Sequence, residues 1–181
     1  GGTYWYHAHI HGHTEAQVAG GAFGLLIVED IGLAPNADID AWMQNDISLM
    51  TSKVGNEVRG NGLVGGDTFT INSGEWYRLR AGFADPKGAT YTFEVSGNCV
   101  LHNVASDGVW RFSVPGPEGT SFETTGSSRK DFAMQCTGAG SVSFNRKTVA
   151  SFVIGGVTTS TATPFFNGNT WAPTRPYHLQ D

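Results

Sequence analysis

Four histidines at two-residue spacing are the residues in this chain whose types and positions best suit chemistry. His7, His9, His11 and His13 directly follow an aromatic run near the start of the sequence. Imidazole nitrogen is a common ligand of copper and zinc, so this array predicts a metal site. Alternate side chains of a strand project from the same face, and the first three imidazoles can therefore line one surface. Gly12 is expected to end the regular strand, which makes His13 the weakest candidate of the four.

Strand geometry also indicates how many metal ions such histidines would bind. Side chains two residues apart on a strand start roughly 6.6 Å from each other. Two nitrogens bound to one ion, each about 2.0 Å from it, lie within about 4 Å of each other. Neighbouring histidines therefore reach more naturally for two adjacent metal ions than for one. The alternative for a His-x-His pair is a surface or cross-strand pair that binds no metal.

The elements that would carry these histidines are few. The pattern predicts a strand over Gly1–His11, a helical turn or loop over Thr14–Gly21, and a strand buried on both faces over Phe23–Glu29. Two strands and a turn are too little to bury a face of their own. We therefore expect them to pair with something outside this sequence, so that the chain is part of a longer protein or one half of a split one.

From Asp46 onward the sequence is typical of an all-β sandwich or barrel, because short alternating segments are separated by glycine and asparagine clusters. In one segment Leu79 and Phe83 share a face, and Arg78 and Arg80 share the other. The strands expected are Asp46–Ser52, Thr68–Ile71, Glu75–Phe83, Tyr91–Val95, Val100–Ala105, Asp131–Gln135, Ser141–Asn145 and Ser151–Ile154.

The composition excludes some classes of partner. The 181 residues carry a net charge of −5, with lysine and arginine scattered singly or in pairs, so there is no basic patch for nucleic acid. No apolar run approaches the length of a membrane span.

The two cysteines are expected to form a disulfide. Cys136 has the same inward parity as Phe132 and Met134, and Cys99 follows another strand of the same sandwich. A bridge would imply an oxidising compartment, so that the protein is secreted or otherwise extracytoplasmic. The alternative is two buried free thiols in a reducing cell.

A known family has a motif similar to the histidine array. The multicopper oxidases (laccase-like enzymes) have a second copper motif that resembles Trp5-Tyr6-His7-Ala8-His9-Ile10-His11-Gly12, followed by Gln17, Gly21 and Gly24. The resemblance implies all-β, cupredoxin-like Greek-key domains. It also implies that His7 and His9 are ligands of the type 3 copper pair in a trinuclear type 2/type 3 cluster, one to each copper. His11 would lie beside these ligands or substitute for one.

The remainder of the chain resembles the middle cupredoxin domain of three-domain members of this family. The residues that carry this resemblance are Asn61-Gly62, Gly74-Glu75-Trp76-Tyr77-Arg78-Leu79-Arg80, Ala105-Ser106-Asp107-Gly108-Val109, Ser128-Arg129-Lys130-Asp131-Phe132 and Gly138 to Phe144. It implies the end of a first cupredoxin domain over 1–35, a linker over 36–45, a middle domain over 46–160 and a tail over 161–181 towards a third domain.

Two other histidines are not assigned to copper. The middle domain of the family carries no copper ligands, and His102 is expected to be a partly buried structural histidine. Near the C-terminus, His178 could be compared with the family's His-Pro-x-His-Leu-His motif. We reject that comparison because Arg175 and Gln180 stand where the motif has histidine.

The resemblance implies a parent protein that oxidises a small reducing substrate one electron at a time and reduces O2 to water. Ala8 stands where a blue, type 1 copper site would need cysteine, so no type 1 site is expected here. The chain alone is expected to be inactive and to need the remaining domains, or a companion chain that completes the first domain. Two alternatives stay open: a non-catalytic structural or assembly protein on the cupredoxin scaffold, and a His-rich copper-binding module without turnover.

Overall fold

The computed structural model describes residues 2–28, 45–85, 87, 89–111 and 118–157. Its elements are β1 (Gly2–His7), α1 (Thr14–Ala19), β2 (Phe23–Val28), β3 (Asp46–Val54), β4 (Glu57–Gly60), β5 (Leu63–Val64), β6 (Asp67–Ser73), β7 (Trp76–Ala84), β8 (Thr90–Ser106), β9 (Val109–Trp110), β10 (Ser121–Thr125), β11 (Arg129–Phe144) and β12 (Lys147–Val157). The all-β prediction is confirmed. The expected linker over 36–45, apart from Asn45, and the expected tail over 161–181 lie outside the described residues.

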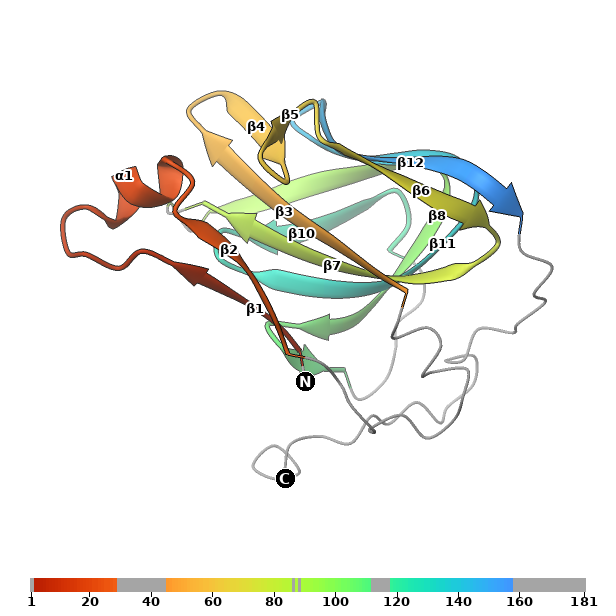
Figure 1. Ribbon diagram of the computed structural model, residues 1–181, viewed down its shortest axis with the longest axis horizontal. Coiled ribbons are helices and arrows are strands. Elements are labelled where there is room, and N and C mark those ends of the chain that lie inside the picture. The colour runs from red at the N-terminus through yellow and green to blue at the C-terminus, as the bar shows by residue number, and fades with distance from the viewer. Residues whose placement is uncertain (1, 29–44, 86, 88, 112–117, 158–181) are drawn as a thin grey trace.

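The strands form two sheets. β1 and β2 make an antiparallel hairpin in which Gly2 faces Val28 and His7 faces Phe23. The other ten strands form one sheet with the path β10-β8-β11-β7-β3-β4-β5, to which β12, β6 and β9 are attached. The hairpin lies beside this larger sheet, with α1 at its far end (Figure 1).

Two long strands curl the larger sheet into a sandwich. The first half of β11 pairs with β7, and its second half pairs with β12, while β8 follows β11 along both halves. The register of β8 and β11 shifts between Cys136 and Gly140, which is where the strands turn from one layer to the other. A β-carbon at Gly140 would lie 2.4 Å from the Cys99 sulfur, so only glycine fits at this corner.

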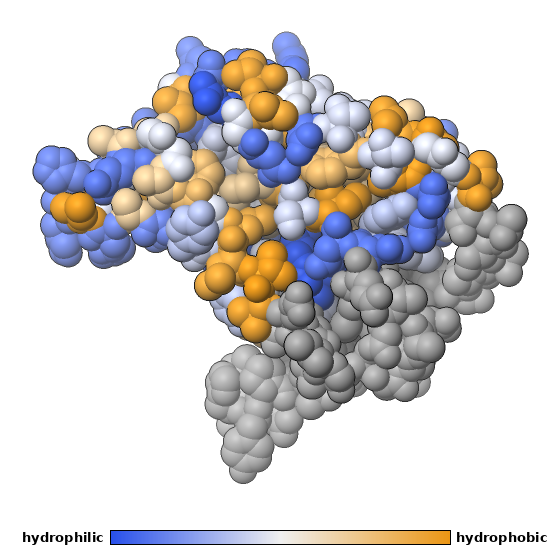
Figure 2. All heavy atoms as spheres, viewed as in Figure 1, coloured by the Kyte–Doolittle hydropathy of each residue, from blue (hydrophilic) through white to orange (hydrophobic). Residues whose placement is uncertain are grey.

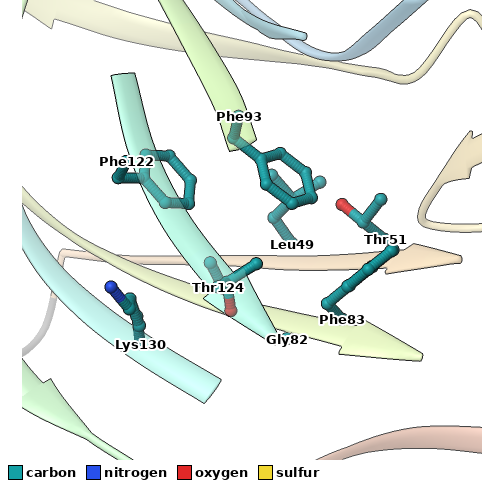
Figure 3. A pocket seen from close by; sticks show the side chains of 9 residues that line it. Leu49, Thr51, Gly82, Phe83, Phe93, Phe122, Thr124 and Lys130 are labelled. Atoms are coloured by element: carbon teal, nitrogen blue, oxygen red, sulfur yellow. The ribbon is translucent and has the colours of Figure 1, made fainter. Parts of the chain in front are cut away.

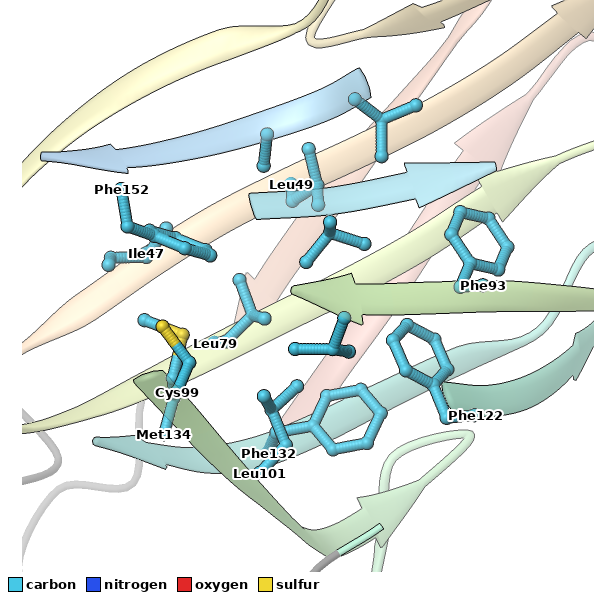
Figure 4. Packing of buried hydrophobic residues seen from close by; sticks show 14 of the residues in the cluster. Ile47, Leu49, Leu79, Phe93, Cys99, Leu101, Phe122, Phe132, Met134 and Phe152 are labelled. Atoms are coloured by element: carbon cyan, nitrogen blue, oxygen red, sulfur yellow. The ribbon is translucent and has the colours of Figure 1, made fainter. Parts of the chain in front are cut away.

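The core fills the space between the two layers (Figure 4). Leu79 and Phe83 of β7 point into it, as their shared parity predicted. The cluster also includes Ile47, Leu49, Phe93, Leu101, Phe122, Phe132, Met134, Val142, Phe144 and Phe152. The disulfide between Cys99 and Cys136 closes one end of this core, which confirms the predicted pairing.

The opposite face of the same strands carries buried charge. Arg78 donates from Nε and Nη2 to Oδ2 of Asp131, at 3.1 and 2.6 Å, and its guanidinium lies 4.5 Å from the ring centroid of Trp110. Arg80 donates from Nε to Asp46, 2.6 Å away. Burying an arginine costs desolvation free energy, and the ion pairs with Asp131 and Asp46 offset part of that cost.

Several expected strands prove to be parts of longer ones. Tyr91–Val95 and Val100–Ala105 belong to one strand, β8. Asp131–Gln135 and Ser141–Asn145 belong to one strand, β11, except that Asn145 lies in the turn after it. The short strands β4, β5, β9 and β10 were not predicted, because a few residues between turns carry little periodicity. None of the helices in the described ranges has the length and apolar character that crossing a membrane requires.

Candidate metal centre

The hairpin positions the histidines, but β1 ends earlier than predicted. The regular strand stops at His7, because its partner β2 begins at the facing residue Phe23. After one more cross-strand bond, from Ala8 N–H to the carbonyl of Ala22, the chain leaves the ladder. The prediction of a strand to His11 was therefore wrong. His9 and His11 lie on the loop that leads into α1, and His13 is the N-cap residue of that helix.

A tight turn shapes this loop. The backbone N–H groups of His13 and Thr14 both donate to the carbonyl of Ile10, at 2.9 and 3.0 Å. Gly12 has φ of +79°, a left-handed conformation that favours glycine. The prediction that Gly12 ends the strand was wrong, because β1 has already ended at His7, and Gly12 lies instead in the turn that leads into α1.

Three imidazoles still follow one another in space. The ring centroids of His7 and His9 are 5.8 Å apart, and those of His9 and His11 are also 5.8 Å apart. His7 is half-buried, whereas His9 and His11 are exposed. The rings are inclined at 48° and 73° to their neighbours, so the three do not form a parallel stack.

Local contacts fix the ring of His7. Its plane lies 21° from that of Trp5, with 4.3 Å between the ring centroids. Its Nδ1 lies 2.9 Å from the carbonyl oxygen of Ala8. Because a carbonyl can only accept, Nδ1 carries the proton, and the lone pair of the neutral ring is on Nε2. This is the arrangement found in metal-bound histidines, whose second nitrogen donates to a carbonyl or carboxylate.

The donor set fits a metal that accepts imidazole nitrogen, such as copper. Within the part of the chain that the structure describes, no three His, Cys, Asp or Glu side chains are gathered to hold one ion. His7 and His9 could thus contribute one nitrogen each to a site that other ligands complete.

The outer face of the hairpin is apolar and exposed. The side chains of Tyr6, Leu26 and Val28 are 60%, 52% and 46% exposed. Figure 2 shows that hydrophobic residues lie at the surface of the molecule in several places. The second strand, which was predicted to be buried on both faces, is covered on one face only within the described part of this chain. The face that carries Leu25 packs against the larger sheet, where it joins a cluster with Met50.

A cleft of about 530 Å³ separates α1 and the start of β2 from the β3–β4 hairpin. Glu57 and Arg59 form an ion pair on its wall, with 2.5 Å between Oε1 and Nη2. Its lining consists of Ala19, Gly20, Gly21, Phe23, Gly24, Met50, Ser52, Val54, Glu57, Arg59, Asn61 and Gly62. Apolar and charged groups share these walls.

A second pocket, at one end of the sandwich core, holds about 10 Å³ and has room for about one water molecule (Figure 3). Lys130 lies among its lining residues with Phe122 and Thr124. Burial lowers the pKa of Lys130, although the carboxylate of Glu118 acts in the opposite direction. The pocket is too small for an organic substrate.

Two further histidines, His102 and His178, were predicted not to bind copper. His102 is half-buried, and its ring centroid lies 6.0 Å from that of Trp76, which agrees with a structural role. His178 lies outside the described residues. The contacts of His7 with Trp5 and Ala8 were not predicted from the sequence. The i, i+2 spacing of Trp5 and His7 on one strand was the signal that could have indicated the first.

Comparisons with known proteins agree with this reading of the fold. No protein-family model and no curated protein matches the chain. Among solved structures, it is similar to a multi-copper oxidase from Pseudomonas thermotolerans, with 18% identity and a TM-score of 0.71 over 88% of this chain and 42% of that one. It is also similar to a multi-copper oxidase from Pediococcus acidilactici, with 15% identity and a TM-score of 0.70 over 98% of this chain and 42% of that one.

A blue copper oxidase from Nitrosomonas europaea is similar as well, with 17% identity and a TM-score of 0.65 over 84% of this chain and 56% of that one. The chain thus has the cupredoxin fold seen in multicopper oxidases, as the sequence resemblance predicted. It spans 42% of the length of the first two of these structures.

Proposed function

We propose that this chain is part of a multicopper oxidase and that His7 and His9 are ligands of its trinuclear copper cluster. The observation that carries the proposal is the arrangement of these two rings at the end of β1 and on the loop that follows it, in a cupredoxin fold. Their centroids are 5.8 Å apart, and the Nδ1–H of His7 is bonded to the Ala8 carbonyl, which leaves Nε2 for a metal. The copper cluster that these residues would help to hold would bind O2 and pass to it electrons taken one at a time from the reducing substrate, so that O2 is reduced to water.

In this proposal the chain comprises the end of a first cupredoxin domain, residues 1–35, and a middle domain, residues 46–160. The exposed outer face of the hairpin supports this division. Tyr4, Tyr6, Leu26 and Val28 lie on that face and are each more than a third exposed, as expected for a sheet that further strands would cover. Those strands, the remaining copper ligands and the type 1 cysteine would come from other segments of the protein or from a companion chain.

The role proposed for the residues of this chain is to hold two imidazoles in place. His7 would keep one tautomer through its bond to Ala8, so that a single nitrogen is presented to the metal. His11 would lie beside the ligands, since its ring follows that of His9. The disulfide supports a further part of the proposal, that the protein works in an oxidising, extracytoplasmic compartment.

The test is to measure copper content and oxygen uptake of the intact natural protein that contains this chain, with a reducing substrate such as a phenol. His7→Ala or His9→Ala should abolish oxygen uptake and leave the blue absorption of the separate type 1 site. A His13→Ala variant is the matched control, and it should retain uptake.

Other results would support the alternatives. Copper bound without oxygen uptake would favour a copper-binding module, and no copper at all would favour a structural protein. Full uptake in both the His7 and His9 variants would contradict the assignment of these ligands.

A further inference from the structure

The face of β1 that packs on the larger sheet carries three residues at alternate positions. Thr3, Trp5 and His7 all point to this side, and Thr3 is completely buried. The last of them is the proposed copper ligand. The side of β1 that presents His7 is therefore the side that contacts the larger sheet. None of the proposed copper ligands lies on that sheet.

Trp5 is the direct neighbour of the His7 ring. The two rings stack with 4.3 Å between centroids and 21° between planes. The bond from Nδ1 to Ala8 fixes which nitrogen is protonated, and the stack restricts rotation of the ring about its side-chain bonds. Together the two contacts determine the direction in which Nε2 points.

Trp5 in turn rests on residues of the larger sheet. It packs against a buried cluster made of Val18 from α1, Met50 from β3 and Ala84 from β7. Gly82 of β7 lets Leu25 of the hairpin and Met50 lie close to the backbone of the larger sheet. A β-carbon there would lie 2.6 Å from the Met50 sulfur and 2.7 Å from Cδ2 of Leu25 on the hairpin.

A separate contact holds the beginning of the strand. Arg80 donates from Nη1 to the hydroxyl oxygen of Thr3, 3.1 Å away, while its Nε is bonded to Asp46. This anchor lies four residues before His7 and does not touch the imidazole. It docks the strand, whereas Trp5 orients the ring.

We propose that Trp5 is a positioning residue for His7, and that the larger sheet, through the buried cluster with Met50 and Ala84 against which Trp5 packs, sets the direction of the His7 Nε2 towards the metal. This inference rests on the proposed function, since it assigns His7 to copper. In this proposal the larger sheet, which carries no proposed copper ligand, helps to set the geometry of the copper cluster.

The experiment compares Trp5→Leu with Trp5→Phe in the intact natural protein, because leucine keeps an apolar side chain and phenylalanine also keeps a ring. Copper affinity is measured by competition with a chelator. In the metal-free protein, the ring-proton NMR shifts of His7 report the stack directly. Trp5→Leu should weaken copper binding by about 10-fold and abolish the ring-current shift. Trp5→Phe should restore most of both.

Two further variants distinguish positioning of the His7 ring from docking of β1 onto the larger sheet. Met50→Ala should change the His7 shifts in the same direction as Trp5→Leu. Thr3→Val removes the bond to Arg80 but leaves the stack, so copper affinity and the His7 shifts should stay close to those of the wild type.

The failing outcomes are distinct. If His7→Ala abolishes copper binding but Trp5→Leu does not weaken it, only the positioning role is overturned. The same holds if Thr3→Val weakens copper binding as much as Trp5→Leu does, because docking of the strand would then be the whole effect. If His7→Ala leaves copper binding unchanged, the proposed function fails, and the positioning role fails with it.

Discussion

Replacing Arg78 by methionine should be among the most destabilising single changes in the larger sheet. The guanidinium is completely buried and donates two hydrogen bonds to the same oxygen of Asp131, at 3.1 and 2.6 Å. In Arg78→Met the carboxylate of Asp131 stays buried, and its remaining ion-pair partner is Arg80, 3.8 Å away.

The size of the effect follows from the burial of both partners. Side-chain exposure is 0% for Arg78 and 3% for Asp131, so solvent cannot replace the lost partner. Removing one member of such a pair costs about 3–5 kcal/mol of unfolding free energy, mainly because the other charge is left buried. We expect about 4 kcal/mol for Arg78→Met. A typical domain has only about 5–15 kcal/mol in total, so the variant would be marginally stable.

The assay is urea unfolding of the intact protein, followed by circular dichroism, with two matched comparisons. The double variant Arg78→Met/Asp131→Leu buries no unpaired charge and should recover most of the loss. Arg59→Met removes an arginine from an exposed ion pair with Glu57, whose side chains are both 45% exposed, and should cost less than about 1 kcal/mol.

One result would refute this reasoning. If Arg78→Met cost no more than Arg59→Met, the pair with Asp131 could not be a buried, unscreened interaction. A double variant less stable than the single one would likewise mean that the loss comes from packing and not from charge.

Three further predictions concern other parts of the larger sheet. Replacing both cysteines by alanine should lower the unfolding free energy by about 4 kcal/mol on the chain-entropy model, because the bridge joins residues 37 positions apart; thermal unfolding with and without reductant would test this, and equal stability would contradict it. A hydrogen bond to Asp85, together with burial, raises the pKa of Tyr91 to about 12. The folded state then holds this proton more tightly than the unfolded one, so a stabilising contribution present below pH 10 should disappear as the pH rises towards 12. Tyr91→Phe should remove that part of the pH dependence in alkaline unfolding curves, and an unchanged curve would exclude the contribution. Burial alone would raise the pKa of Glu75, but hydrogen bonds from Asn72, Tyr77 and Asn45 outweigh it and hold the pKa below its usual value. Stability from Glu75 should therefore be present above about pH 4.5 and be lost as the pH falls; Glu75→Gln should flatten the acid limb of an unfolding titration, and a limb as steep as in the wild type would count against the network.

The sequence was sufficient for those features that depend on local pattern. The two-residue alternation in β7 predicted that Leu79 and Phe83 share one face and Arg78 and Arg80 the other, because a strand presents successive side chains to opposite sides. The structure places the first of these faces in the core. Inward parity also predicted the pairing of Cys99 with Cys136, which the structure confirms.

The sequence predicted the histidine array but not where its strand ends. Alternation continues in the sequence to His13, whereas β1 stops at His7, because a strand lasts only as long as its partner does. Strand length also depends on pairing in β8 and β11, and for that reason each was predicted as two strands. The bulge that lets them continue around the corner of the sandwich depends on pairing between the two strands.

The partners of the buried charges were decided by the tertiary structure alone. Arg80 meets Asp46 and Thr3, which are 34 and 77 positions away in the sequence. No local periodicity can reveal such contacts, because the first forms only when β3 pairs with β7 and the second only when the hairpin packs on the larger sheet. The sequence therefore determined which side chains have the chemistry of metal ligands and which strand faces are apolar, while packing between distant segments decided where Trp5, the neighbour of His7, rests and what neutralises the buried arginines.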